Sequence, residues 1–177
     1  QLTRTLGGKG ANQAVAAAML GAQVSMVGAL GADVDGAWAY DQLEAQGIDT
    51  SQVREVDPAT GTAMILTEPE GEHSIAMAPG ANEGVSIAGV QFPPNGIILA
   101  QLEIGMDVIE ELADITPGFL VLNAAPARSL PTAVVDGADL IIVSDSELSI
   151  MPSIAGAKRT VVTYGDRGAA YFEYEQD

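Results

Sequence analysis

Cysteine is missing altogether from the 177-residue sequence, which excludes disulfide bridges, thiolate zinc sites and cysteine nucleophiles. Histidine occurs once, at His73, so neither a histidine-based metal site nor a Ser-His-Asp triad is expected. Basic residues are scarce as well: seven Lys and Arg stand against 24 Asp and Glu, which gives a formal net charge of −17. Because such a surface repels phosphate backbones, we expect no nucleic-acid partner.

Long apolar runs are also lacking, although 47% of the residues are hydrophobic. No run approaches the roughly 18–20 residues that span a bilayer, and no secretory signal is visible, so we expect no membrane partner. The hydrophobic content is large enough for a packed core and argues against global disorder. The absence of cysteine fits a reducing compartment, and we expect a cytoplasmic location.

Hydrophobic spacing predicts the local structure of the first 50 residues. Apolar side chains recur at three- and four-residue intervals over residues 8–22, which predicts a helix. Val24–Val27 is a short apolar run typical of a strand, and the Gly- and Asp-rich residues 28–36 are expected to form a loop. A second helix is expected over Ala37–Gln46, with Asp35 as a candidate cap.

The rest of the chain contains many short strand patterns. Two of them, Thr62–Leu66 and Ser74–Met77, are joined by residues 67–72, whose Pro and Gly indicate a hairpin turn. Beyond the hairpin, short apolar runs alternate with a helical spacing at Val108–Leu112. This alternation predicts a mostly parallel α/β sheet covered on both faces. The expected strands are Ile97–Gln101, Phe119–Leu122, Leu140–Val143, Thr160–Thr163 and Ala169–Tyr174.

The first stretch that carries chemistry is the run GGKGANQ at residues 7–13. Its glycines let a backbone approach a ligand closely, and the helix that follows offers N–H donors at its start. Lys9 adds a cation, and the Asn12 amide can both donate and accept. Gly10 follows the Lys where a Walker A loop has Ser or Thr. These residues alone predict either a polar ligand near a helix start or an ordinary glycine-rich loop.

The same run, extended to GGKGANQAVAA, resembles the N-terminal signature of ribokinases in the PfkB-type carbohydrate kinase family. The resemblance implies a ribokinase-like three-layer α/β sandwich with a mostly parallel central sheet and a small β-sheet lid near residues 60–80. We expect one domain over residues 1–177, incomplete at both ends. Further blocks that match in family order are Gly28–Asp33, Gly47–Asp49, Thr60–Ala63, Pro79–Asn82, Gln101–Glu103, Leu122–Ala127 and Thr163–Gly168.

The resemblance also implies roles for individual residues. Gly8, Lys9 and Asn12 match positions that bind sugar hydroxyls, and Glu103 matches an acidic residue that accepts from one of them. Strand residues Ala63 and Met77 match the lid that covers the sugar, and a homodimer through this lid is a candidate assembly. ATP and Mg²⁺ are the implied cofactors, with a monovalent cation such as K⁺ as a further candidate. Ser144, Thr163, Gly165 and Gly168 match positions of the nucleotide site. Ser144 stands where the family usually has Asn. Glu147 matches the residue near Mg²⁺.

The catalytic Asp of the family lies in a Gly-Ala-Gly-Asp motif that does not occur in this sequence, and we expect it beyond Asp177. We likewise expect the first strand, with a sugar-binding Asp, before Gln1. The resemblance implies an ATP-dependent sugar kinase that phosphorylates D-ribose at O5 to give ribose 5-phosphate. Another sugar or a nucleoside as acceptor is the alternative within the family. A non-catalytic sugar-binding homologue is the alternative from another class, motivated by the missing motif and by Ser144.

Overall fold

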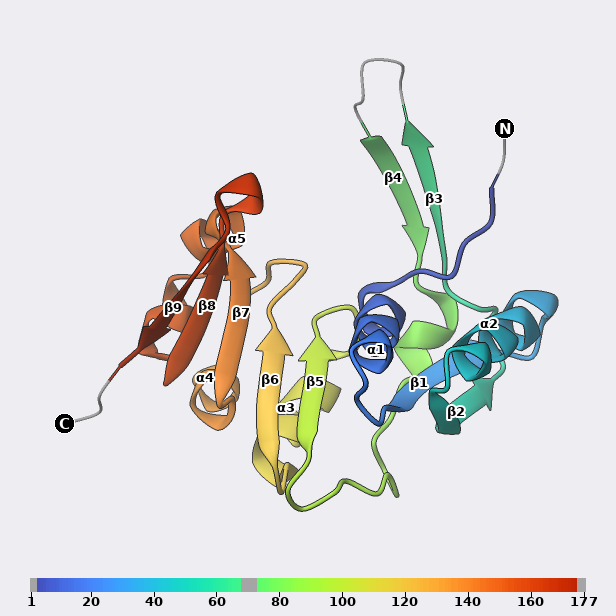
Figure 1. Cartoon of the computed structure of the whole chain (residues 1–177), viewed down its shortest axis with the longest axis horizontal. Helices are drawn as coiled ribbons and strands as arrows, with labels where there is room; N and C mark the ends of the chain where they lie inside the picture. Colours follow the sequence, from blue (N-terminus) through green and yellow to red (C-terminus); the bar gives the residue numbers. More distant parts are fainter. Residues whose placement is uncertain (1–2, 68–72, 175–177) are drawn as a thin grey trace. The chain divides into compact units, whose positions relative to one another are not determined.

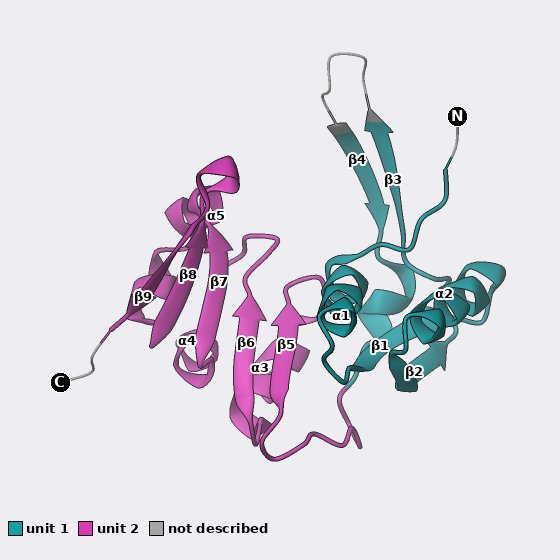
Figure 2. Ribbon diagram, viewed as in Figure 1, with its two compact units in different colours: residues 1–86 teal, residues 87–177 magenta. Residues whose placement is uncertain are grey.

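The computed structural model describes residues 3–67 and 73–174, and the chain divides into two compact units, residues 1–86 and 87–177 (Figure 2). Across these described ranges, no helix is both long and apolar enough to cross a membrane. Each unit has its own secondary structure, labelled in Figure 1.

The first unit begins with two helices and a pair of parallel strands. They are α1 (Lys9–Met19), β1 (Ser25–Gly31), α2 (Val34–Ala45) and β2 (Asp49–Val56), with β1 paired to β2. Small and branched side chains of the two helices and the adjoining loops pack into one core. Its buried members are Ala11, Ala14, Leu43 and Ile48, with Leu6, Val15, Ala18, Val24 and Met26 packed against them.

Three expectations for this region were wrong. Strand β1 continues through Gly28 to Gly31, because this glycine-rich stretch pairs with β2 instead of forming a loop. Strand β2 was not predicted, since its sequence DTSQVREV is largely polar and buries Thr50 rather than an apolar stripe. Helix α2 starts earlier than expected, and Asp33 is its N-cap in place of Asp35. The Asp33 carboxylate accepts a hydrogen bond from the backbone N–H of Gly36 at 2.7 Å.

The predicted hairpin is confirmed as antiparallel strands β3 (Thr62–Thr67) and β4 (His73–Ala78). The turn was predicted over residues 67–72; Thr67 is instead the last residue of β3, and residues 68–72 lie outside the described residues. A 3₁₀ turn, η1 (Gly80–Gly84), follows β4 and contacts β1. The hairpin is therefore rooted in the β1 side of the first unit.

The second unit is built on a five-stranded sheet with the strands in chain order. The first four strands are parallel and the last is antiparallel, which confirms the mostly parallel sheet. Side chains on alternate positions, such as Leu122, Ile141, Val143 and Val162, are fully buried. The strands are β5 (Ile97–Gln101), β6 (Phe119–Asn123), β7 (Leu140–Ser144), β8 (Arg159–Thr163) and β9 (Ala169–Glu173).

Short helices connect these strands. The spacing at Val108–Leu112 correctly predicted α3 (Met106–Ile115), whose residues Val108, Ile109 and Leu112 are buried on one face. Helix α3 packs against α4 (Thr132–Gly137), and α4 contacts a 3₁₀ turn, η2 (Pro152–Gly156). The sequence did not predict the shorter elements α4 (Thr132–Gly137), α5 (Asp145–Ile150), η2 (Pro152–Gly156) and η3 (Gly165–Arg167).

Candidate functional site

The glycine-rich run forms an open loop at the start of α1. Gly8 is the N-cap residue with φ of 90°, a left-handed value that favours glycine. Among the described residues, no atom lies within 4 Å of the position that a Cβ would take at Gly7 or Gly8. Lys9 is the first helical residue, and the backbone N–H of Asn12 donates to the Gly8 carbonyl at 3.0 Å. The loop thus presents the amino end of an 11-residue helix to open space.

Asn12 also lines a recess in the first unit. The recess has a volume of about 260 Å³, and the residues around it are Leu6, Asn12, Val15, Gln42 and Gln46. Three of these five side chains are amides that can both donate and accept hydrogen bonds. Gln42 lies in α2 and Gln46 is its C-cap residue, and neither carried a sequence signal for this position.

Ala63 and Met77 face each other across the hairpin. They are register partners in β3 and β4, and both are exposed. Because side chains alternate along a strand, Ile65 and Ile75 share their face. The hairpin therefore presents an apolar face that contains both predicted lid residues.

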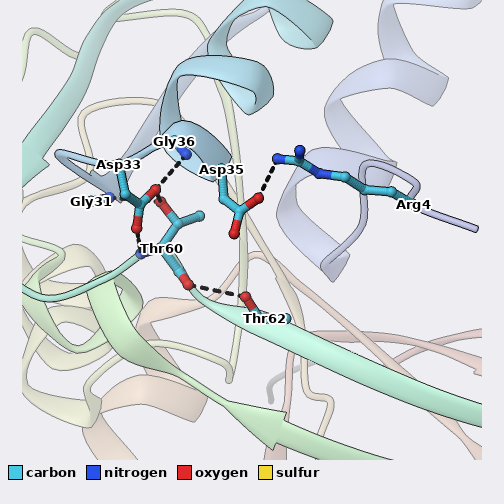
Figure 3. Close-up of polar contacts among 7 residues, drawn as sticks. All are labelled: Arg4, Gly31, Asp33, Asp35, Gly36, Thr60 and Thr62. Carbon is cyan, nitrogen blue, oxygen red and sulfur yellow. Dashed lines mark hydrogen bonds and ion pairs between the residues drawn. The ribbon is translucent and has the colours of Figure 1, made fainter. Parts of the chain in front are cut away.

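A hydrogen-bond network holds the root of this hairpin to β1 and α2 (Figure 3). The Asp33 carboxylate accepts from the Thr60 hydroxyl at 2.7 Å, from the Thr60 N–H at 2.8 Å and from the Gly36 N–H at 2.7 Å. The Thr60 hydroxyl oxygen in turn accepts from the Gly31 N–H at 3.0 Å. These bonds, with that of the Thr60 side chain first, hold the pKa of Asp33 below its ordinary value.

The second end of the hairpin is fixed in the same place. The Ala81 N–H, beyond β4, donates to the Ala59 carbonyl at 2.8 Å. On the other side of the network, Arg4 pairs with Asp35 and its guanidinium lies 4.2 Å from the centre of the Trp38 ring. The chain before α1 and both ends of the hairpin are thus anchored around the start of α2 (Figure 3).

In the second unit, polar residues gather where the parallel strands end. Gln101 pairs with Asn123 at the ends of β5 and β6, and Ser144 pairs with Thr163 at the ends of β7 and β8. Glu103 follows β5 after one residue, Leu102. The carboxyl ends of parallel strands are where ligands collect in open α/β sheets.

Ser144 and Glu147 bond to each other at the start of α5. The Glu147 Oε2 atom accepts from the Ser144 N–H and hydroxyl, both at 2.8 Å. The Glu147 N–H donates to the Ser144 hydroxyl oxygen at 3.2 Å, which completes a capping box. The helix-cap alternative for Ser144 is therefore present in the structure, and Glu147 is held next to it.

The loop after β8 lies beside this cap. Gly165 and Gly168 both have positive φ, 62° and 87°, and Tyr164 N–H donates to the Gly168 carbonyl at 2.8 Å. The Arg167 guanidinium reaches back to the first turn of α5 and pairs with Asp145 at 3.0 Å. The predicted nucleotide residues Ser144, Thr163, Gly165 and Gly168 and the predicted metal residue Glu147 thus share one end of the second unit's sheet.

The loop that carries Glu103 is held by the neighbouring connection. The backbone N–H of Leu102 donates to the Ala125 carbonyl at 3.0 Å. One nitrogen of Arg128, Nη1, donates to the carbonyl oxygens of Leu102 and Ile104, each at 3.3 Å. The carbonyl oxygens of the residues before and after Glu103 therefore both accept from one guanidinium.

No part of the described chain brings three or more His, Cys, Asp or Glu side chains together in a way that could hold a metal ion. The predicted sugar residues divide between the units, with Gly8, Lys9, Asn12 and the lid pair in the first and Glu103 in the second.

Comparison with known families accounts for this combination of loop, hairpin and sheet. The family model described as "pfkB family carbohydrate kinase" matches residues 1–177. The chain belongs to the pfkB family of carbohydrate kinases.

Individual pfkB-family relatives are ribokinases. The ribokinase of Bacillus subtilis is 35% identical over 182 residues, which cover 93% of this chain and 62% of the relative. The solved ribokinase of Thermotoga maritima matches with a TM-score of 0.86 and 25% identity, over 96% of this chain and 64% of its own. The Arabidopsis thaliana ribokinase, solved with ribose and ATP, matches with a TM-score of 0.83 and 26% identity, over 97% and 64%.

These relatives confirm the expected ribokinase-like α/β fold, with a mainly parallel sheet and a separate small sheet. The pfkB-family chain described here spans less than two thirds of the length of each of the three.

The sequence did not predict the residues whose long-range hydrogen bonds hold the hairpin root and the Glu103 loop in place. Asp33 and Thr60 bond across 27 positions, and Arg128 reaches carbonyls 24 and 26 positions away. No local spacing encodes such contacts. The only available signal was that Asp33, Thr60 and Arg128 lie in or directly beside blocks that match the pfkB family.

Proposed function

We propose that this chain supplies the sugar-binding residues and part of the nucleotide site of an ATP-dependent kinase that converts D-ribose to ribose 5-phosphate. The observation that carries the proposal is the clustering of polar residues at the carboxyl ends of parallel strands in a pfkB-family chain. The 35% identity to a bacterial ribokinase supports ribose as the acceptor, as does the likeness to a plant ribokinase solved with ribose and ATP.

On the sugar side, Gly8, Lys9, Asn12 and Glu103 bind the hydroxyl groups. A buried polyol needs donors and acceptors in equal measure, and this set offers an ammonium, an amide and a carboxylate. Ala63 and Met77 form the apolar cover. Such a cover excludes water, which would otherwise accept the phosphoryl group in place of the sugar.

On the nucleotide side, Thr163, Gly165 and Gly168 contact ATP, and Ser144 lies next to them in register. Mg²⁺ is commonly held by one or two carboxylates together with substrate phosphates and water. Glu147 and Asp145, in the first turn of α5, fit this requirement, whereas a metal site made by the protein alone would need more ligands. When bound, Mg²⁺ neutralises charge on the phosphates. Arg167 adds a cation at the same loop.

In the proposed reaction O5 of ribose bonds to the γ-phosphorus of ATP, the bond from that phosphorus to the bridging oxygen of ADP breaks so that ADP leaves, and the O5 proton passes to a base. The family's Gly-Ala-Gly-Asp segment supplies that base, and the 177 residues do not contain the motif. The residues of this chain therefore bind, orient and shield the reactants, which is where most of the catalysis of phosphoryl transfer lies.

The test is ADP release by the full-length protein with Mg·ATP, with and without K⁺, and with ribose, 2-deoxyribose, fructose, adenosine or no sugar. We expect turnover that depends on ribose. Glu103→Gln should lower kcat/KM for ribose by about 10- to 100-fold, because it replaces a charged acceptor with a neutral amide and so weakens the hydrogen bond. Arg159→Met, at the opposite end of the sheet, is the control and should retain activity. Turnover with a different acceptor and none with ribose would refute ribose as the substrate. Ribose binding without turnover would favour a non-catalytic sugar-binding protein.

We also propose a homodimer through the outer face of the hairpin. Large apolar side chains are exposed on both faces of β3 and β4, and an isolated two-stranded sheet of this kind is marginal in water. With Ala63 and Met77 facing the sugar, the opposite face, with Met64 and Leu66, is left for a second copy. The exposed side chains are Met64, Ile65, Leu66, Ile75 and Met77, with 58–68% of their surface accessible.

Sedimentation velocity of Leu66→Glu tests this assembly. We expect the variant to be monomeric where the parent is dimeric. Leu20→Glu, at an exposed position just after α1, is the matched control and should leave the dimer intact. A monomeric parent, or equal dimer content in both variants, would exclude the hairpin as the contact.

A further inference from the structure

Arg128 is the residue that ties Glu103 to the body of the second unit. It lies in the connection between β6 and α4, and β6 pairs directly with β5, the edge strand that precedes Glu103. Its Nη1 atom donates to the carbonyls of Leu102 and Ile104, each at 3.3 Å. One charged donor therefore bonds to the peptide oxygens on both sides of Glu103.

The residues next to these hydrogen bonds are buried. Leu102 is only 2% exposed, and its N–H is bonded to the Ala125 carbonyl at 3.0 Å. Ala124 and Ala125, at the start of the connection that carries Arg128, are themselves buried. The connection after β6 thus holds the Glu103 loop at three points, one from its backbone and two from the Arg128 side chain.

The geometry has a direct consequence for the Glu103 carboxylate. Three residues, Glu103 to Gly105, join the buried Leu102 to the start of α3 at Met106. Without the guanidinium, the Leu102 and Ile104 carbonyls lose these two hydrogen bonds, and the peptide groups around Glu103 gain freedom to rotate. A carboxylate that must meet one sugar hydroxyl loses binding when its backbone moves, because displacement by about 1 Å is enough to cost on the order of 100-fold in rate.

We propose that Arg128 is a positioning residue that fixes Glu103 for sugar binding. The part of this inference that concerns the sugar rests on the proposed function. The part that concerns the loop stands on the hydrogen bonds of the second unit alone. Arg128 acts through Glu103 and is not itself assigned a contact with sugar or nucleotide.

The first measurement is amide hydrogen exchange of the full-length protein over residues 101–106. Arg128→Met should speed exchange in this segment and leave exchange in β8 unchanged, which also shows that the variant folds. Arg128→Lys keeps a charged donor that can serve two carbonyls and should restore much of the protection. Arg159→Met removes an arginine from the same unit and should have no effect at residues 101–106. Unchanged exchange of residues 101–106 in Arg128→Met would overturn the inference, whatever the substrate proves to be.

The second measurement is the kinetic split. Arg128→Met should raise KM for ribose by about 10-fold or more and change KM for ATP much less, with partial rescue by Arg128→Lys. In a protein that already carries Glu103→Gln, adding Arg128→Met should cause little further rise in KM for ribose, because Arg128 then has no carboxylate to position. Additive losses in the double variant, or a selective rise in KM for ATP, would refute a role through Glu103. A parent protein inactive on ribose refutes the proposed function instead, and the exchange result still decides whether Arg128 holds the loop.

Discussion

Replacing Gly31 with Ala tests how tightly the hairpin root is packed against β1. Gly31 is buried at the end of that strand. An added Cβ would stand 2.5 Å from the Thr60 nitrogen, 2.7 Å from the Pro58 carbonyl oxygen and 2.9 Å from the Ala59 carbonyl carbon. All three neighbours are backbone atoms, so no side-chain rotation can make room. Non-bonded carbon contacts are favourable at about 3.5–4.0 Å, so the backbone of residues 58–60 must move by roughly 1 Å.

The cost follows from this geometry. Overpacking of a well-packed site typically costs about 1–3 kcal/mol. Movement of Thr60 would also stretch its bond from the Gly31 N–H, now 3.0 Å long, which places the expected value in the upper part of that range. Each kcal/mol lowers the Tm of a domain of this size by roughly 2–4 °C.

The assay is urea and thermal unfolding of the full-length protein, followed by circular dichroism. Gly28→Ala is the matched control on the same strand, because its added Cβ would meet only the end of the Met26 side chain, at an ordinary 3.7 Å. We expect Gly28→Ala to lie within about 0.5 kcal/mol of the parent. If Gly31→Ala is as stable as Gly28→Ala, the close approach of the hairpin root to β1 is not present in solution.

Two further predictions concern the residues that cap helices, Asp33 at α2 and Ser144 at α5. Because hydrogen bonds lower the pKa of Asp33 below its ordinary 3.8, the unfolded chain takes up this proton more readily. The stability that this carboxylate contributes is fully present above about pH 3.8, the ordinary pKa, and is lost as the pH falls through the lowered pKa. In urea unfolding measured between about pH 6 and pH 2, the free energy of unfolding of Asp33→Asn should therefore fall less at acid pH than that of the parent. At the start of α5, Ser144→Ala should destabilise the protein by about 0.5–2 kcal/mol and Ser144→Asn by much less, since Asn is also a good N-cap. A urea midpoint of Ser144→Ala equal to that of the parent would mean that the capping box contributes no stability.

The sequence predicted best where strands are short and apolar. Ile97–Gln101 was expected and observed with the same bounds, and the hairpin strands differ from expectation by at most one residue at each end. A buried strand in a parallel sheet must be apolar along its length, so composition alone marks it. Strand β2 shows the limit of this signal, because Asp49–Val56 is stabilised by pairing with β1 and carries little hydrophobic pattern.

The candidate site divides in the same way. The resemblance to the pfkB family suggested the roles of Gly8, Ser144 and Glu147, and the structure places these residues at the starts of α1 and α5. The supporting contacts of Asp33 and Arg128 depend on which loops the fold brings together, so no window of sequence contains them. Asp35 is a candidate cap because it lies just before the helix expected at Ala37. The N-cap is Asp33, whose carboxylate also accepts from the Thr60 N–H, a contact that the local sequence does not reveal.

In the proposed metal role of Glu147, its carboxylate would link cation binding to the formation of α5 through a single oxygen, Oε2. Its Oε2 atom accepts both bonds from Ser144 that begin α5. A cation that draws this oxygen away must do so against the capping energy, about 0.5–2 kcal/mol, and its observed affinity is weaker by that amount. By the same linkage, a cation that uses only the other carboxylate oxygen leaves the helix start intact and adds its binding energy to the stability of the fold.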